Sequence, residues 1–203
     1  MGTASPLRQR WYPMRSTNSH QSAATLPQST LRQLFLALVG TLVIAISAKI
    51  KVPMWPVDMS LQTLAIFGIA GVFGLRLGLA TVLLYLAEGA LGLPVFQGTP
   101  ERGIGLAYMA GPTGGYLAGF VAMSIVTGWA ADRGWWRSPV RIGVAMLVGE
   151  TAMLVLGTLW LVIHFGLGQG IAFGIGPFVV PDLFKIGIAA GLVSVAGGVL
   201  RKT

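Results

Sequence analysis

Two oppositely charged residues stand three positions apart near the end of the chain, in the otherwise apolar run PFVVPDLFKIGI. Inserting a charged residue at the centre of a membrane helix costs roughly 2.5–3.5 kcal/mol. Such residues therefore need either a compensating partner or a functional role. On a helix, Asp182 and Lys185 would share one face. Pro181 suits a first turn, which would place Asp182 near the start of a half-helix, pointing inward from the outer side. The pair could simply neutralise itself, but apolar residues would insert more easily, so we favour a polar face toward a cavity. An adjacent acceptor and cation suit a ligand that has N–H donors and a carboxylate.

Other groups in the apolar part of the chain are less specific. Glu88 and Glu150 could each bind a proton, face a water-filled cavity or sit near an interface. His164 is expected at the membrane interface rather than as a ligand. The sequence contains no H-E-x-x-H and no G-x-S-x-G motif, and no lysine follows a glycine, so a Walker A motif is excluded. If the protein moves a solute uphill, its energy must come from an ion gradient or a separate ATPase.

The elements that carry these residues are predicted to be membrane helices. The 203 residues are 54% hydrophobic and 10% charged, whereas soluble domains carry about 25% charged residues. A span needs about 20 mainly apolar residues, and the absence of cysteine excludes disulfides and thiolate metal sites. The sequence predicts an all-α, polytopic membrane protein: a polar cytoplasmic tail over residues 1–30 and a six-helix bundle over 31–203. The six helices are expected at 31–50, 59–75, 77–95, 104–131, 140–165 and 171–199.

The net charge of +8 is interpreted as a topology signal. With six spans, both termini lie on one side, and most basic residues fall on that side. Cytoplasmic loops carry the excess of Lys and Arg in membrane proteins. The basic residues therefore predict cytoplasmic termini and no nucleic-acid partner. Those assigned to the cytoplasmic side are Arg8, Arg10, Arg15, Arg32, Arg76, Arg133, Arg137, Arg141, Arg201 and Lys202.

Two outer segments are candidates for a cavity. Pro53 and Pro56 prevent regular helix in KVPMWPVDMSLQT, and this loop could cover a cavity or rest in the headgroup layer, where Trp is common. Gln62 and Thr63 could bind a ligand or satisfy nearby backbone. The glycines of residues 111–116 could line a cavity or allow tight helix packing.

Small residues in the first helix form a stripe at four-residue spacing. Such stripes let another helix approach closely. They could dock a partner protein or pack within this bundle. The residues of the stripe are Ala37, Thr41 and Ala45.

Four stretches resemble the BioY family, the biotin-specific substrate-binding (S) components of energy-coupling-factor (ECF) transporters. They are LQTLAIFGIAG, LYLAEGALGLPVFQGTPERGIG, GPTGGYLAGF and PFVVPDLFKIGIAA, in matching order across residues 31–200. The resemblance implies a six-helix bundle in the bacterial cytoplasmic membrane that binds biotin from outside. It also implies a transmembrane coupling protein and ATPase subunits as partners. ATP would be used by those partners, and this chain would need no cofactor of its own.

The resemblance also implies roles for particular residues. Asp182 and Lys185 match family residues that contact biotin, with Asp182 accepting a ureido N–H and Lys185 orienting it or donating to a ligand oxygen. Ala37, Thr41 and Ala45 occupy the place of the family's docking motif, although Thr41 departs from an all-alanine pattern. The remaining candidates are the apolar Phe96, Tyr116 and Trp55 and the polar Gln97, Gln62 and Arg102.

Two other readings of the residues stay open at this point. One is a stand-alone secondary carrier in which Glu88 or Glu150 couples transport to protons. The other is an intramembrane enzyme that uses Asp182 as an acid or base, which the absence of nucleophile motifs disfavours.

Overall fold

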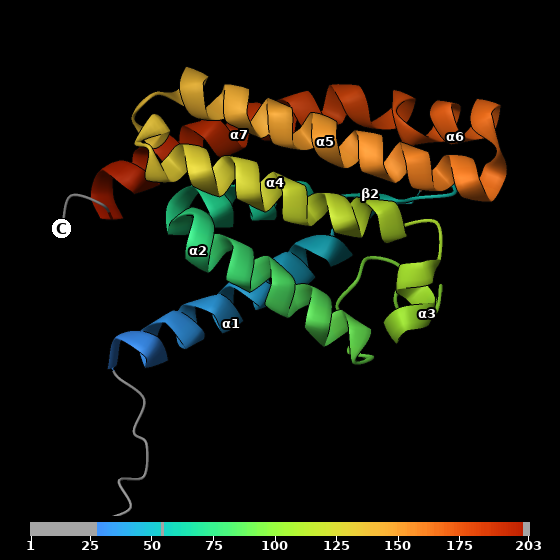
Figure 1. Ribbon diagram of the computed structural model, residues 1–203, viewed down its shortest axis with the longest axis horizontal. Helices are drawn as coiled ribbons and strands as arrows, with labels where there is room; N and C mark the ends of the chain where they lie inside the picture. The colour runs from blue at the N-terminus through green and yellow to red at the C-terminus, as the bar shows by residue number, and fades with distance from the viewer. Residues whose placement is uncertain (1–27, 54, 201–203) are drawn as a thin grey trace, which may run out of the picture.

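Long apolar helices make up most of the computed structural model, which describes residues 28–53 and 55–200 (Figure 1). Within this part of the chain, five segments are long and apolar enough to cross a bilayer: Ser29–Lys49, Gln62–Ala90, Gly114–Asp132, Pro139–Phe165 and Leu167–Gly198. In lipid, every backbone polar group needs an internal partner, which a helix supplies within its own segment. The all-α membrane fold predicted from the sequence is confirmed.

The second of these segments is a helical hairpin. Helix α1 (Gln28–Lys49) precedes α2 (Gln62–Ala90), which is interrupted at Gly74, where φ is 78° and ψ is −174°. A Cβ built on Gly78 would lie 2.9 Å from the Cα of Ala70, whereas eight residues of straight helix would separate the two positions by about 12 Å. The two arms of α2 therefore run back along each other, and they correspond to the second and third predicted helices. Counting them separately gives about six passes, although the first arm is shorter than a full span.

The outer connections contain two small elements that the sequence did not predict. Strands β1 (Lys51–Val52) and β2 (Met59–Ser60) pair antiparallel, with Lys51 opposite Ser60. The helix expected over 104–131 is instead α3 (Gly105–Ala110) followed by α4 (Gly114–Asp132). The break falls at Gly111, which is extended, and at Pro112, which has no N–H for a helical hydrogen bond.

The last part of the chain comprises η1 (Trp135–Arg137), α5 (Pro139–Phe165), α6 (Leu167–Gly174) and α7 (Gly176–Leu200). Helix α5 starts after Ser138, whose hydroxyl accepts a hydrogen bond from the Arg141 N–H. The predicted helix start at Pro181 is wrong, because α7 begins at Gly176 and Pro181 lies inside it. Asp182 is consequently in the second turn of a continuous helix.

The two ends of the bundle differ in what they hold. Figure 1 shows the start of α1, the end of α7 and η1 at one end, and β2, α3 and α6 at the other. Arg133, Arg137 and Arg141 lie around η1, which makes that end cytoplasmic by the positive-inside rule and agrees with the predicted orientation. Residues 1–27 of the predicted tail, with Arg8, Arg10 and Arg15, lie outside the described residues, as do Arg201 and Lys202.

The core lies between α2, α4, α5 and α7, where fully buried side chains such as Phe67, Met123, Met146 and Val193 meet. Apolar side chains also point outward from α1, α5 and α7. Phe35, Ile163 and Phe184 are 65%, 75% and 72% exposed. An exposed apolar surface of this kind suits contact with acyl chains.

Candidate ligand-binding site

A cavity lies toward the outer end of the bundle. Its volume is about 30 Å³, far below the roughly 300–1,000 Å³ of small-molecule sites, so a ligand of that size would enter only if the side chains or the loop that line it moved. Its walls are mainly apolar, with a few polar groups that could fix the orientation of a ligand. The lining residues come from the loop that contains β2, from the segment before α3, and from α2, α4, α5 and α7: Val57, Asp58, Ser60, Thr63, Gln97, Thr113, Tyr116, Phe120, Met153, Phe178, Asp182 and Lys185.

Asp182 and Lys185 form a buried ion pair in the wall of this cavity. Lys185 Nζ lies 2.7 Å from Asp182 Oδ1, and the two residues are 2% and 8% exposed. The i, i+3 spacing on α7 brings them together, as predicted from the sequence. Asp182 Oδ2 is buried and has no hydrogen-bond partner among the described residues. Because a buried acceptor is costly to leave unpaired, this oxygen is available for an N–H group of a bound ligand.

Glu150 lies behind this pair, on α5. It is 3% exposed, and its carboxyl group interacts with both Asp182 and Lys185. Glu150 is outside the cavity lining. Neither of its carboxyl oxygens has a hydrogen-bond donor in the described part of the chain. The sequence identified Glu150 as an acid within a span, but its position beside Asp182 is a product of helix packing.

Tyr116 forms an apolar wall of the cavity. Its hydroxyl donates a hydrogen bond to the carbonyl of Gly174, at 3.0 Å, and its ring lies 5.6 Å from that of Phe178. Helix α5 passes close by because Gly157 has no side chain, and a Cβ there would collide with the ring. The neighbouring Gly115 packs on Trp160. Both readings of the glycine cluster therefore apply, since it packs tightly and also borders the cavity.

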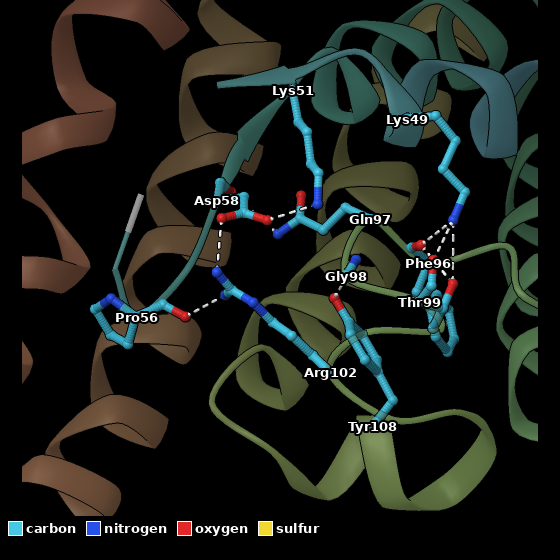
Figure 2. A network of polar contacts seen from close by, with 10 residues as sticks. All are labelled: Lys49, Lys51, Pro56, Asp58, Phe96, Gln97, Gly98, Thr99, Arg102 and Tyr108. Carbon is cyan, nitrogen blue, oxygen red and sulfur yellow. Dashed lines mark hydrogen bonds and ion pairs between the residues drawn. The ribbon is translucent and has the colours of Figure 1, made fainter. Parts of the chain in front are cut away.

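A polar network closes the outer side of the cavity (Figure 2). Asp58 is 3% exposed, and its carboxylate pairs with Lys51 at 3.1 Å and with Arg102 at 2.8 Å. Arg102 also donates to the Pro56 carbonyl at 2.6 Å, and Gln97 Nε2 donates to the Asp58 carbonyl at 3.0 Å. The loop after β1 is thus tied to the segment that precedes α3. Residues of this loop line the cavity, which favours a cover over a role confined to the headgroup layer.

Lys49, at the end of α1, fixes the segment that carries Gln97. Its ammonium donates to the carbonyls of Phe96 and Thr99, at 2.8 and 2.9 Å, and to the Thr99 hydroxyl at 3.2 Å (Figure 2). The Tyr108 ring stacks on Phe96, with centroids 5.0 Å apart. Burial raises the pKa of the Tyr108 phenol, so this group stays neutral at physiological pH.

The predicted ligand residues fall into three places. Four of them line the cavity: Asp182, Lys185, Tyr116 and Gln97. Trp55, which is 70% exposed, and Arg102 line a separate outer pocket of about 210 Å³, which shares Thr113 with the cavity.

Phe96 and Gln62 lie in packed regions outside the cavity lining. Phe96 contacts Tyr85 and Tyr108, and Gln62 donates to the Tyr85 hydroxyl at 2.6 Å. Gln62 thus satisfies a neighbouring group, whereas the adjacent Thr63 faces the cavity.

The predicted docking stripe faces the interior of the bundle. Ala37 and Thr41 are buried, and Ala45 packs against the core. The Thr41 hydroxyl donates to Glu88 on α2, at 3.0 Å. Of the two readings, this placement favours packing within the bundle. The outward face of α1 instead carries Phe35, Leu42 and Ile46.

Sequence reasoning missed Asp58, Thr113 and Phe178 as cavity residues. Asp58 had a signal, since it is one of six acidic residues and follows Lys51 by seven positions across a proline-containing loop. Thr113 and Phe178 had no such signal, because the sequence of an apolar stretch does not show which of its side chains point into a cavity.

Comparisons with known proteins agree in both sequence and fold. A sequence profile described as the BioY family matches residues 17–202. The "Biotin transporter BioY" of Thermotoga maritima is 37% identical over 164 residues, covering 79% of this chain and 92% of that protein. The "Biotin transporter BioY2" of Lactococcus lactis subsp. cremoris is 33% identical over 162 residues, covering 79% and 87%. A crystal structure of "the S-component for biotin from an ECF-type ABC transporter" matches with a TM-score of 0.74 at 22% identity, covering 89% of this chain and 96% of that one, and so shares the fold.

Proposed function

This chain belongs to the BioY family, and from that premise we propose that it captures biotin at the outer face of the bacterial cytoplasmic membrane as the S component of an ECF transporter. The family is one of transporters, and the apolar helices make this chain a multi-pass membrane protein. We propose further that the chain itself catalyses no reaction and needs no cofactor. ATP would then be used by partner subunits.

The observation that carries this proposal is Asp182 Oδ2, a buried oxygen of a cavity-lining residue that has no hydrogen-bond partner among the described residues. Biotin has a ureido group with two N–H donors and one carbonyl. Asp182 Oδ2 can accept one of these N–H groups, while Lys185 holds Oδ1 and keeps the carboxylate oriented. The Tyr116 and Phe178 rings, which lie side by side in the lining, supply apolar surface for the fused rings.

The charges around the cavity support an orientation for the other end of the ligand. The aliphatic chain of biotin ends in a carboxylate. At the outer side of the cavity, Lys51, Arg102 and Asp58 together carry a net charge of +1. A carboxylate would be attracted to that side, whereas Asp182 is already paired with Lys185 and would attract it no further. The chain of biotin would therefore point outward.

The partners are proposed to be a transmembrane coupling protein and a pair of ATPase subunits. Docking through Ala37, Thr41 and Ala45 would require α1 to rotate or separate from α2, because Ala37 and Thr41 are buried against the bundle. Partner cross-linking at Ala37 and at the outward-facing Phe35 would distinguish the two faces of the helix.

Mass spectrometry of the small molecule that co-purifies with the detergent-solubilised protein tests the substrate. We expect biotin, chemically unchanged, and saturable binding of added biotin by calorimetry. Another vitamin would overturn the substrate assignment but not the fold. A chemically altered ligand would indicate an enzyme.

A stand-alone carrier is a second candidate, motivated by the buried acid Glu150 beside the cavity. It predicts biotin uptake into proteoliposomes that contain this protein alone, and loss of uptake when a protonophore is added. The S-component proposal predicts no concentrative uptake until the coupling protein, the ATPases and ATP are present.

A further inference from the structure

Glu150 is a buried acid that does not line the cavity, yet it interacts electrostatically with Asp182 and Lys185, which do. It comes from α5, whereas Asp182 and Lys185 come from α7. Tyr116 on α4 lines the same cavity as Asp182 and interacts electrostatically with it. The cluster of Glu150, Asp182 and Lys185 thus combines two carboxyl groups with one ammonium group, in a place from which solvent is excluded.

The number of protons in this cluster follows from its hydrogen bonds. If both carboxyl groups were ionised, neither could donate, and three buried oxygens would lack a donor: both oxygens of Glu150 and Oδ2 of Asp182. Two like charges side by side disfavour full ionisation. One proton between them creates a carboxyl–carboxylate hydrogen bond. It also makes the cluster neutral, with one carboxylate, one carboxylic acid and one ammonium.

The proton belongs on Glu150 rather than on Asp182. Asp182 Oδ1 accepts a charge-assisted hydrogen bond from Lys185 at 2.7 Å, which stabilises its ionised form. Glu150 makes no such contact within the described part of the chain. An ionised carboxylate has about four acceptor positions, so Oδ2 can accept from Glu150 and from a ligand at once.

We propose that Glu150 is a positioning residue of the binding site, which retains its proton and donates it in a hydrogen bond to Asp182 Oδ2. Together with Lys185, it holds the Asp182 carboxylate from two sides and keeps it ionised to receive the ligand's N–H group. The proton stays with the protein and is not transported. This inference rests on the proposed function, because the ligand measured is biotin.

Three variants test the role of the proton by calorimetric measurement of biotin affinity at neutral pH. Glu150→Gln should bind within about threefold of the unmodified protein, because an isosteric amide supplies the same donor. Glu150→Leu should lose about 10- to 100-fold, as expected when a hydrogen bond to a charged group is removed. Glu88→Gln, a second acid within a span that contacts Thr41 and not the cavity, should match the unmodified protein. An equal, large loss in Glu150→Gln and Glu150→Leu would overturn the inference, because it would mean that an ionised Glu150 is needed.

The pH profile gives a readout that a purely structural role would not change. Raising the pH removes the proton that the bound state requires, so the affinity of the unmodified protein should fall. Glu150→Gln has no such proton and should lose this step, whereas both proteins share any step from Lys185 or Tyr116. Identical profiles would contradict the proposal.

Infrared spectroscopy tests the proton without any ligand. The unmodified protein should show the carbonyl stretch of a buried carboxylic acid, and this band should vanish in Glu150→Gln but persist in Glu88→Gln. If the band persists in Glu150→Gln, the inference is wrong. If the unmodified protein does not bind biotin at all, the proposed function fails, while the infrared result still decides the state of Glu150.

Discussion

Two groups of charged residues, one on each side of the cavity, use the same chemistry in different surroundings. At the outer end, Asp58 pairs with Lys51 and Arg102, whose side chains are 29% and 35% exposed. Deeper in the bundle, Asp182 pairs with Lys185, whose side chain is only 10% exposed. The outer carboxylate has a cation at each oxygen, whereas Lys185 pairs with only one oxygen of Asp182 and leaves Oδ2 outside the ion pair.

This difference indicates what each group does. Water and salt screen partly exposed ion pairs, so each contributes little free energy. Several such pairs together suit a loop that is held closed but can still open. A buried pair is hardly screened, and its desolvation can cost more than the pairing returns. A carboxylate oxygen that lies outside the ion pair and in the cavity wall suits a role in ligand binding better than one in folding. The outer network is therefore expected to govern rates, and the inner cluster affinity.

The largest effect is expected from Asp182→Asn. The substitution removes the carboxylate that receives the ligand and leaves Lys185 buried without its counter-ion, so biotin affinity should fall by about 100-fold or more. Calorimetric titration of biotin into purified protein measures it. Asp132→Asn, at the cytoplasmic end, where Asp132 accepts from the Leu75 N–H, is the matched control. Unchanged affinity in Asp182→Asn would place the ligand elsewhere.

Removing both members of the inner pair should separate binding from stability. Asp182→Leu or Lys185→Met alone should lower the free energy of unfolding by about 3–5 kcal/mol, because each leaves one buried charge uncompensated. The double variant should regain most of that stability but not bind biotin. Thermal unfolding in detergent, combined as a double-mutant cycle, measures the coupling. Additive losses in the double variant would show that the two charges do not stabilise each other.

A smaller effect is expected from Asp58→Asn in the outer network. Losing the charge weakens two partly exposed ion pairs, which should raise the dissociation rate of biotin about tenfold. Stopped-flow displacement with labelled biotin measures the rate. Salt sharpens the comparison: at 1 M, where the screening length is about 3 Å, the unmodified protein should approach the variant, and the variant should hardly respond. A salt response that is equal in both proteins would argue against this role for Asp58.

The smallest effect is expected from Lys49→Met. Lys49 steadies the segment that carries Gln97 but does not line the cavity, and its side chain reaches solvent. Biotin dissociation should therefore accelerate by only about threefold. Gln97→Glu offers a comparison within the same segment, since it places a carboxylate beside the Asp58 carbonyl and should be more harmful. A loss with Lys49→Met as large as that with Asp182→Asn would mean that the outer network decides affinity.

Much of the fold could be predicted because it depends on local properties. The long apolar stretches of the sequence predicted where the helices lie. The distribution of basic residues predicted the orientation, with Arg133 and Arg137 on the cytoplasmic side. The errors arose where local signals conflict with packing. Gly111 and Pro112 divide a helix that composition alone would continue, whereas Pro181 lies within a helix that it was expected to begin.

The site was predicted in part, for a related reason. Asp182 and Lys185 were found because charge is rare in an apolar run and their spacing is local. The predicted candidates Phe96 and Gln62 turned out to pack against Tyr85 instead of lining the cavity. Glu150 was noticed only as an acid within a span, since nothing local says which helix it meets.

The sequence by itself showed that this protein lies in a membrane, how it is oriented there, which family it resembles and which helix carries the paired charges. Tertiary structure alone decided that Glu150 meets Asp182, that Asp58 closes the cavity, and that Ala37 and Thr41 point inward. The physical reason is that lipid and the interior of the bundle are both apolar. The hydrophobic periodicity that shows the buried face of a helix in a water-soluble protein is therefore weak here. Which faces meet is set by side-chain packing between helices that are far apart in the sequence.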